Sequence, residues 1–330
     1  MQSNIIHIAS AADEKYKKHL MAMVSSAISS AGSKYKIVFH LWGDGFSNES
    51  TLVFEGFIAG KGHEINWLED ISRGLDIPIT MYFTRAASFR LFLADVIEDT
   101  VDTVIYLDSD TIVCDGGLER LANVKLDGHA LAAVTDADHD FKYTRKRIGI
   151  DDKTYRYFNS GVLVINLKRW REENATGKHI TAMTENHSKL LFVDQDILNL
   201  VWKDDVMYLL LNFNVTSVNY ALPPKFLAKG NGSPYYRIAE IYGATETPFV
   251  LHFYGYMMNR PWKKACYHPK KNYYMKAANE SPYRFAQEKT SLCEMLYYVR
   301  IHYLGYPETV IKRMFFGAAS WVKSNILMRK

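Results

Sequence analysis

Cysteine is scarce in this chain of 330 residues. The three cysteines, Cys114, Cys266 and Cys293, lie far apart and show no CxxC spacing. This pattern argues against a structural zinc site or a disulfide framework, and we expect free thiols in a reducing compartment. Long apolar runs are also missing, since none reaches the roughly 20 residues that a membrane-spanning helix needs. Any contact with a membrane is therefore expected to be peripheral.

An excess of one charge sign is absent as well. The chain has 40 Lys and Arg against 36 Asp and Glu, a formal net charge of +4, and this near balance argues against a nucleic-acid partner. The apolar stretch at residues 5–12 has no basic segment before it and charged residues directly after it. We interpret it as a first strand and not as a signal peptide.

Apolar residues are plentiful enough for one large α/β core, alone or with an appendage. Strands are predicted at residues 4–9 and 36–42, with an amphipathic helix at residues 14–31 between them, an opening typical of a parallel α/β sheet. Further strands are predicted at residues 102–107, 130–134, 162–166, 206–210 and 249–252, and further helices at residues 84–97, with Thr84 as N-cap, and 194–202.

The composition changes near residue 265. Residues 260–276 contain six Lys or Arg and no acidic residue, and the rest of the chain is aromatic and basic without strand alternation. We therefore divide the chain into a first domain, residues 1–265, and a helical, basic and aromatic C-terminal extension, residues 266–330.

Two carboxylates follow directly after a strand-like apolar segment at residues 104–107. Asp108 and Asp110 are two positions apart, so they would share a face at the end of the strand. Two adjacent carboxylates repel each other unless a positive charge joins them, and a divalent cation that also holds a diphosphate would do so. His252 ends another predicted strand, and an imidazole favours manganese over calcium. The alternatives are exposed acids at a strand end and a structural histidine.

Five separated segments extend this pattern along the chain. They are residues 11–16 (AADEKY), 107–110 (LDSD), 158–162 (FNSGV) with 166–167 (NL), 194–199 (DQDILN), and 252–255 (HFYG) with 260–262 (RPW). In this order the set resembles the retaining glycosyltransferases of family 8, in particular the bacterial lipopolysaccharide-core hexosyltransferases. The resemblance covers roughly the first 265 residues, and it implies a GT-A-like, Rossmann-type catalytic domain that binds a nucleotide sugar.

The resemblance also implies roles for individual residues. Mn2+, or Mg2+ in its place, would be bound by Asp108, Asp110 and His252. The catalytic residues around the transferred sugar would be Asn159, Asp194 and Gln195. The UDP-sugar donor would be bound by Ala11, Asp13, Tyr16, Arg90, Asp108, Ser109, Asp110, Gly255 and Arg260.

Within that set, Asp13 would bond the edge of the uracil ring, Tyr16 would stack on it, and Arg90 would lie near the diphosphate and sugar. The plainer alternatives are a helix-packing tyrosine for Tyr16, a surface salt bridge for Arg90, and helix caps for Asn159 and Asp194.

The sequence departs from the family pattern at two places. Residues 256–259 (YMMN) lengthen the loop between His252 and Pro261, and Arg260 stands where the family usually has lysine. Lys15 stands where many members have asparagine. The longer loop and Arg260 would change the geometry of the phosphate contact. Lys15 would change a contact to the ribose or the base.

The C-terminal segment at residues 309–328 predicts an amphipathic helix. One side is apolar and aromatic and the other is basic, a pattern that suits an anionic membrane surface. We expect a cytoplasmic protein bound peripherally to the cytoplasmic face of the inner membrane. The alternative is a helix that packs on the catalytic domain or on a second copy.

The expected activity is retaining transfer of glucose or galactose from a UDP-sugar to a hydroxyl of a lipopolysaccharide-core or other cell-surface glycan. One alternative is a nucleotidyltransferase that makes a nucleotide sugar. That class needs a glycine-rich phosphate loop after the first strand, whereas residues 9–16 contain no glycine. A second alternative is a non-catalytic protein that binds carbohydrate or membrane.

Overall fold

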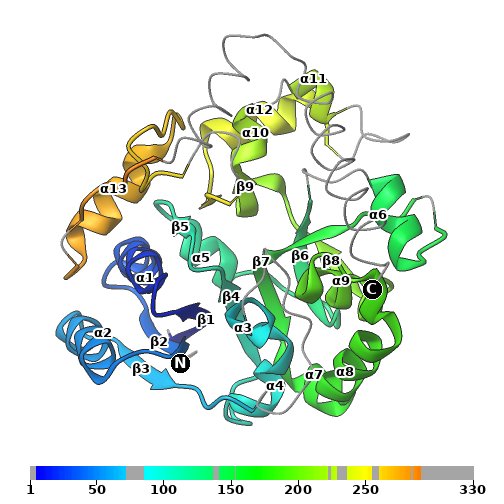
Figure 1. Ribbon diagram of the computed structural model, residues 1–330, viewed down its shortest axis with the longest axis horizontal. Helices are drawn as coiled ribbons and strands as arrows, with labels where there is room; N and C mark the ends of the chain where they lie inside the picture. Colours follow the sequence, from blue (N-terminus) through cyan, green and yellow to red (C-terminus); the bar gives the residue numbers. More distant parts are fainter. Residues whose placement is uncertain are drawn as a thin grey trace, which may run out of the picture.

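A mixed β-sheet with helices on both faces forms the centre of the computed structural model (Figure 1). The structure describes residues 5–71, 85–136, 141–152, 154–221, 224–228, 236–254, 260–283 and 285–290. The largely parallel sheet confirms the α/β class that the sequence predicts.

Among the described residues, seven strands form the main sheet. Their spatial order is β3 (Glu64–Trp67), β2 (Lys36–Asp44), β1 (Ile5–Asp13), β4 (Thr103–Leu107), β7 (Phe158–Asn166), β6 (Leu131–Thr135) and β8 (Val206–Tyr208). All neighbours pair in parallel except β7, which runs antiparallel to both β4 and β6. A small second sheet orders β5 (Thr111–Val113), β10 (Val250–His252) and β9 (Val215–Thr216).

The helices of the described residues are mostly short. The α-helices are α1 (Lys17–Ala31), α2 (Asn48–Gly60), α3 (Arg85–Ser88), α4 (Leu93–Val96), α5 (Gly117–Ala122), α6 (Phe141–Ile148), α7 (Leu167–Glu172), α8 (Ala175–Asn186), α9 (Val193–Val201), α10 (Ser217–Ala221), α11 (Pro224–Leu227), α12 (Ile238–Glu246) and α13 (Lys271–Glu280). Three 3-10 helices are η1 (Phe89–Phe92), η2 (His187–Lys189) and η3 (Leu211–Asn214).

The central strand β1 feeds apolar side chains to both faces of the sheet. Ile6 and Ile8 join the core under α1 and α2, while Ala9 and Ala11 join the core under α4, α7, α8 and α9. This alternation follows from the two-residue period of a strand. The strand runs on to Asp13 because β1 pairs with β2 as far as Asp44. The helix begins at Lys17 instead of the predicted residue 14, after a turn in which Asp13 Oδ1 accepts the N–H of Tyr16 at 2.9 Å.

The helix predicted at residues 84–97 is wrong as a continuous element. The chain forms α3, then the 3-10 turn η1, then α4. Nε of Arg90 donates to the carbonyl of Ala87 at 2.9 Å, and the guanidinium continues into the interior to a partner on β7, the carbonyl of Ser160. Long-range contacts of Arg90 thus compete with regular helix, which periodicity cannot reveal. Thr84, the predicted N-cap, lies outside the described residues.

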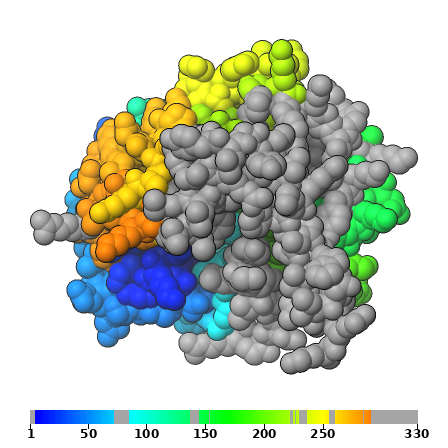
Figure 2. Space-filling model, turned by 45° about the horizontal axis from the view of Figure 1, so that its top comes forward, coloured from blue at the N-terminus to red at the C-terminus, as the bar shows by residue number. Residues whose placement is uncertain are grey.

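Helix α13, beyond the predicted boundary at residue 265, packs on α1 near the start of the chain (Figure 2, orange beside dark blue). Tyr274, Ala277 and Ala278 of α13 are buried in the same core as α1. The division at residue 265 stays a prediction. The amphipathic segment 309–328 lies outside the described residues, within which no helix has the length and hydrophobicity to cross a membrane.

His179, buried on α8, hydrogen-bonds to Leu91 and Trp202. Its burial predicts that the folded protein loses stability in acid. Trp202 donates its indole N–H to Nε2 of His179 at 2.9 Å, so Nδ1 must donate to the carbonyl of Leu91 at 2.8 Å. Burial lowers the pKa of His179 from 6.5 to about 4. The unfolded chain therefore binds the proton more tightly, and stability falls as the pH drops from about 6.5 to about 4.

Each such histidine contributes at most about 1.4 kcal/mol per pH unit. Urea unfolding at a series of pH values should show this decline, and His179→Gln should make it shallower. Burial also lowers the pKa of His19 and His40 to about 4, so the variant should keep part of the slope. An identical slope in the variant would contradict this assignment.

Candidate active site

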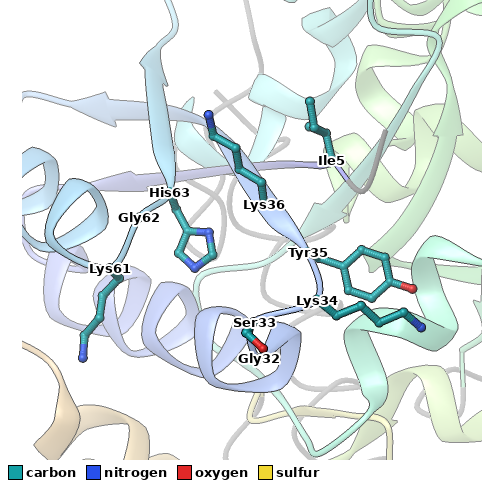
Figure 3. A pocket seen from close by; sticks show the side chains of 9 residues that line it. All are labelled: Ile5, Gly32, Ser33, Lys34, Tyr35, Lys36, Lys61, Gly62 and His63. Carbon is teal, nitrogen blue, oxygen red and sulfur yellow. The ribbon is translucent and has the colours of Figure 1, made fainter. Parts of the chain in front are cut away.

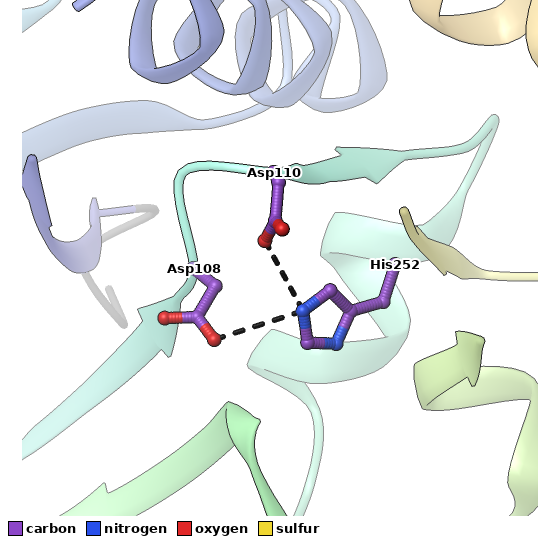
Figure 4. Close-up of side chains that lie close together, drawn as sticks. All are labelled: Asp108, Asp110 and His252. Carbon is purple, nitrogen blue, oxygen red and sulfur yellow. Dashed lines mark ion pairs between the residues drawn. The ribbon is translucent and has the colours of Figure 1, made fainter. Parts of the chain in front are cut away.

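Two carboxylates and one imidazole converge where β4, β5 and β10 meet (Figure 4). Nε2 of His252 lies 3.1 Å from Oδ1 of Asp110 and 3.7 Å from Oδ2 of Asp108. The predicted convergence is confirmed, but its cause differs from the expected strand pleat. Asp108, Ser109 and Asp110 form the turn between β4 and β5, and the pairing of His252 with Thr111 brings β10 alongside.

The surroundings of this cluster fit a metal ion. One ligand atom from each of Asp108, Asp110 and His252 lies within 4.8 Å of the others. Gly161 on β7 leaves the space open, because a Cβ there would lie 2.2 Å from Cε1 of His252 and 2.7 Å from Oδ2 of Asp108. Two carboxylates with an imidazole are a suitable donor set for a divalent transition metal.

Arg90 lies between the metal-binding cluster and Asp194 and contacts both. Its guanidinium donates to Oδ1 of Asp108 at 2.6 Å and lies 3.1 Å from Oδ2 of Asp194, with 3% of the Arg90 side chain exposed. Burial opposes the charge of Arg90, but Asp108 and Asp194 offset this cost and raise the pKa of Arg90. The surface salt bridge considered for Arg90 is therefore wrong, since Arg90 and Asp194 are both buried.

The carboxylates differ in their electrostatics. Burial raises the pKa of Asp194, and Arg90 counteracts this only in part. Burial also opposes ionisation of Asp110, but His252 and Arg260 together lower the pKa of Asp110. The pKa of His252 is in turn raised by Asp110, against the effect of burial. The charged form is thus favoured at Asp110, beside His252, and disfavoured at Asp194.

The three residues predicted around the sugar lie together. Oγ of Ser160 donates to Oδ2 of Asp194 at 2.8 Å, and the backbone N–H of Ser160 donates to Oε1 of Gln195 at 3.1 Å. Asn159 and Gln195 both donate to Oδ2 of Asp136, at 3.3 and 2.8 Å. Among the described residues, Oδ1 of Asp194 is buried without a hydrogen-bond partner, so a ligand hydroxyl would satisfy it.

The residues predicted to hold the nucleotide follow the end of β1. Ala11 is buried on β1, and Asp13 ends the strand. Tyr16 is half-buried, and its hydroxyl accepts from the guanidinium of Arg260, which itself lies over the ring of Trp262. Ser109 is half-buried in the turn between the two aspartates. Gly255 lies outside the described residues.

The residues of segment 194–199 have two different kinds of surroundings. Asp196 accepts from Arg147 at 2.7 and 2.8 Å, from Tyr157 at 2.7 Å, and from the N–H groups of residues 191 and 192. Asn199 bonds the N–H and the carbonyl of Phe158. Asp196 and Asn199 therefore hold α9 against its neighbours, while Asp194 and Gln195 face β7 and Asp136.

Sequence reasoning missed four residues of the site. Asp136 follows β6 as Asp108 follows β4, so an acid after a predicted strand was an available signal. Tyr106 donates to Oδ1 of Asp108 at 3.1 Å, and Tyr254 donates to Oδ1 of Asp136 at 3.3 Å. Asn214 contacts His252 and Asn159 but follows no recognisable motif. These side chains support residues that were predicted.

A surface hollow of about 550 Å³ lies at the opposite ends of the strands (Figure 3). Ile5 and Lys36, the first residues of β1 and β2, line this hollow. Asp13 lies at the other end of β1. The side chains of Lys34, Lys36 and Lys61 point in different directions, and Lys34 and Lys36 pair with Glu119 and Glu64. Ligands of open α/β sheets bind at the carboxyl ends of strands, where the carboxylate cluster lies.

Comparison with known proteins agrees with this geometry. A family model described as glycosyl transferase family 8 matches residues 7–266. A lipopolysaccharide 1,2-glucosyltransferase of Escherichia coli (strain K12) is 28% identical, over 63% of this chain and 58% of that protein. A lipopolysaccharide 1,3-galactosyltransferase of Salmonella typhimurium (strain LT2) is also 28% identical, over 84% of this chain and 77% of that protein.

A solved structure is similar over most of the chain. The galactosyltransferase LgtC, crystallised in complex with donor and acceptor sugar analogues, has a TM-score of 0.73 and 26% identity. The similarity covers 84% of this chain and 97% of that chain.

Proposed function

Because the chain belongs to glycosyl transferase family 8, we propose that it is a retaining, Mn2+-dependent hexosyltransferase that uses UDP-glucose or UDP-galactose. The observation that carries the proposal is the convergence of Asp108, Asp110 and His252 beside the buried pair of Arg90 and Asp194. Membership of a glycosyltransferase family favours this activity over nucleotidyl transfer and over a purely binding role.

The donor would lie across the carboxyl ends of β1 and β4. Asp13 would bond the uracil edge and Tyr16 would stack on the ring, while Arg260 next to Tyr16 would face the diphosphate. Asp194 would accept from sugar hydroxyls, since its Oδ1 has no hydrogen-bond partner among the described residues. The contact between Arg260 and Tyr16 would keep the base-binding and phosphate-binding groups in a fixed relation.

The residues of the site would act mainly by stabilising the charges that develop on the departing diphosphate and on the anomeric carbon. Mn2+, when bound by Asp108, Asp110 and His252, supplies positive charge for the departing diphosphate. Arg260 would add to that charge, and Gln195 would steady the cation-like anomeric carbon through its side-chain carbonyl. An amide is a poor nucleophile, so we infer front-side attack, in which the departing phosphate receives the proton of the acceptor hydroxyl.

The acceptor would be a hydroxyl of a lipopolysaccharide-core or other cell-surface glycan. This part of the proposal is supported by the two relatives, a lipopolysaccharide 1,2-glucosyltransferase and a lipopolysaccharide 1,3-galactosyltransferase. Incubation with an α-linked UDP-hexose and lipopolysaccharide-core oligosaccharides tests it. NMR of the product should show a new α linkage, and a β linkage would overturn the retaining assignment.

Gln195→Ala should lower kcat by about 100-fold while the donor KM stays nearly unchanged, because its carbonyl acts mainly in the transition state. Steady-state kinetics with the preferred UDP-sugar measures both constants. Gln287→Ala is the matched control, since Gln287 makes one long contact of 3.5 Å to the carbonyl of Pro261. A large rise in KM with unchanged kcat would assign Gln195 to ground-state binding instead. A glycosyl ester trapped on Asp194 would replace front-side attack by double displacement.

We also propose peripheral attachment to the cytoplasmic face of an anionic membrane through residues 309–328. The support is the basic and aromatic pattern of that segment, with about 1 kcal/mol gained per basic residue near an anionic surface. A chain that ends at Pro307 should fail to co-sediment with anionic vesicles yet keep donor hydrolysis, and salt should weaken binding of the full chain. Equal sedimentation of the shortened chain, or its unfolding, would place the segment in the core.

A further inference from the structure

A chain of hydrogen bonds runs beside the carboxylate cluster from the backbone of Gly161 through Asn159 and Asn214 to His252. The backbone N–H of Gly161 lies 2.9 Å from Oδ1 of Asn159, and a backbone N–H can only donate. That side-chain atom is therefore the amide oxygen. The amide nitrogen then faces Oδ2 of Asp136 at 3.3 Å, and a carboxylate can accept this bond. The orientation of the Asn159 amide follows from the backbone of β7 and needs no further assumption.

The orientation of Asn159 determines that of Asn214. The side chain of Asn214 lies 2.7 Å from Oδ1 of Asn159, so the atom in contact must be its donor, Nδ2. Oδ1 of Asn214 then faces Nδ1 of His252 at 3.1 Å. An amide oxygen only accepts, so Nδ1 of His252 carries a proton. Asn214 is 1% exposed and His252 is 3% exposed, so bulk water does not replace this contact.

With its proton on Nδ1, neutral His252 has a lone pair on Nε2. That atom faces Oδ1 of Asp110 at 3.1 Å and Oδ2 of Asp108 at 3.7 Å. Three acceptor atoms that face one another repel unless a cation lies between them, either a metal ion or, in its place, a proton on Nε2. The other oxygen of Asp108 is held by Arg90 and Tyr106, at 2.6 and 3.1 Å, which leaves Oδ2 for the cation.

We propose that Asn214 is a positioning residue that holds His252 in the metal-binding tautomer and links the metal site to Asn159 beside the sugar. This inference rests on the proposed function. A metal-bound histidine commonly donates its second ring N–H to an acceptor that fixes the tautomer and the ring orientation, and loss of that acceptor weakens metal binding about 10- to 100-fold. Here a single amide also reaches Asn159, so both sites depend on one side chain.

Calorimetric titration of the full chain with Mn2+ tests the proposal without reference to activity. Asn214→Ala should bind Mn2+ about 10- to 100-fold more weakly than the unchanged chain. Asn214→Asp keeps an acceptor for Nδ1 of His252 but loses the donor to Oδ1 of Asn159. Its Mn2+ affinity should therefore stay closer to that of the unchanged chain than the affinity of Asn214→Ala does. The matched control is Asn219→Ala. Asn219 is also buried and bonds Thr216 in the next segment, and it does not contact His252 in the hydrogen bonds described.

The Mn2+ affinities of these variants distinguish a failure of the role of Asn214 from a failure of the proposed function. A folded Asn214→Ala variant with unchanged Mn2+ affinity contradicts the role of Asn214, as does an equal loss in Asn219→Ala. If the alanine variant does not fold, a folded Asn214→Asp variant that binds Mn2+ as poorly as Asp110→Ala contradicts it instead. An unchanged chain that binds no Mn2+ contradicts the proposed function itself.

The tautomer can also be measured directly. Nitrogen NMR of histidine-labelled, metal-free protein, at a pH where His252 is neutral, should show a proton on Nδ1 and none on Nε2. The spectrum of His252→Gln assigns the signals. A neutral His252 with its proton on Nε2 would overturn the proposal.

Discussion

Asp110→Ala is expected to lower Mn2+-dependent turnover of the UDP-sugar by at least about 1,000-fold, since the metal contributes several kcal/mol to stabilising the departing diphosphate. Oδ1 of Asp110 is the carboxylate oxygen nearest to Nε2 of His252, and 14% of the Asp110 side chain is exposed. The fold should survive, because Asp110 lies in a turn between strands and is not part of the apolar core. Kinetics and thermal unfolding of the same sample measure both effects.

The matched control for Asp110 is Asp115. This residue is exposed and also lies near the end of β5, so Asp115→Ala should keep full turnover. Treatment of the unchanged chain with EDTA should reproduce the effect of Asp110→Ala, and added Mn2+ should restore activity only to the unchanged chain. Full activity in Asp110→Ala, or after EDTA treatment, would remove the metal from the proposed mechanism.

Asp196→Ala is expected to lower the free energy of unfolding by about 3 to 5 kcal/mol, the usual cost of breaking a buried ion pair. Asp196 is 0% exposed and accepts two bonds from Arg147, one from Tyr157 and two from backbone N–H groups. Its removal takes this carboxylate away from all five donors at once. Urea unfolding measures the loss.

Two neighbouring aspartates complete this comparison. Asp194→Asn should lower the unfolding free energy less than Asp196→Ala does, because an amide oxygen can still accept from Arg90 and Ser160 and because burial already disfavours the charge of Asp194. It should also lower turnover and weaken selection of the donor sugar. Asp204→Ala removes an exposed aspartate and should be neutral in both measurements. If Asp196→Ala unfolds at the same urea concentration as Asp204→Ala, the structural role of Asp196 is wrong.

The sequence predicts the position of the metal-binding cluster better than its geometry. An apolar strand before Asp108 and another before His252 are strong local signals, and both strands form. However, the approach of His252 depends on the pairing of β10 with β5, a contact between residues more than 100 positions apart. Periodicity describes how one strand presents its side chains, and it contains no information on which strands become neighbours.

The resemblance could not separate Asp194 from Asp196. Both lie in the segment that matches the family, and both are buried at the start of α9. Only the structure shows that Asp196 accepts hydrogen bonds from Arg147, Tyr157 and backbone N–H groups. Oδ1 of Asp194, by contrast, has no hydrogen-bond partner among the described residues. The distinction depends on Arg147 and Tyr157, which no motif connects to this segment.

The break of the predicted helix at residues 84–97 has a similar origin. Its apolar periodicity is genuine, since Phe89, Phe92 and Leu93 are all buried. The contacts of Arg90 with Asp108, Asp194 and Ser160 come from the turn after β4, from α9 and from β7. These tertiary contacts outweigh local helix preference, which amounts to less than about 1 kcal/mol per residue.

We propose that the chain transfers a hexose from a UDP-sugar with the help of Mn2+ bound by Asp108, Asp110 and His252. The most direct measurement is slow hydrolysis of a panel of UDP-, ADP- and GDP-sugars by the purified full chain, without acceptor, in the presence of Mn2+ or EDTA. We expect UDP release from UDP-glucose or UDP-galactose that EDTA abolishes and Mn2+ restores. Release that is indifferent to EDTA, or hydrolysis of ADP- or GDP-sugars alone, would contradict this proposal.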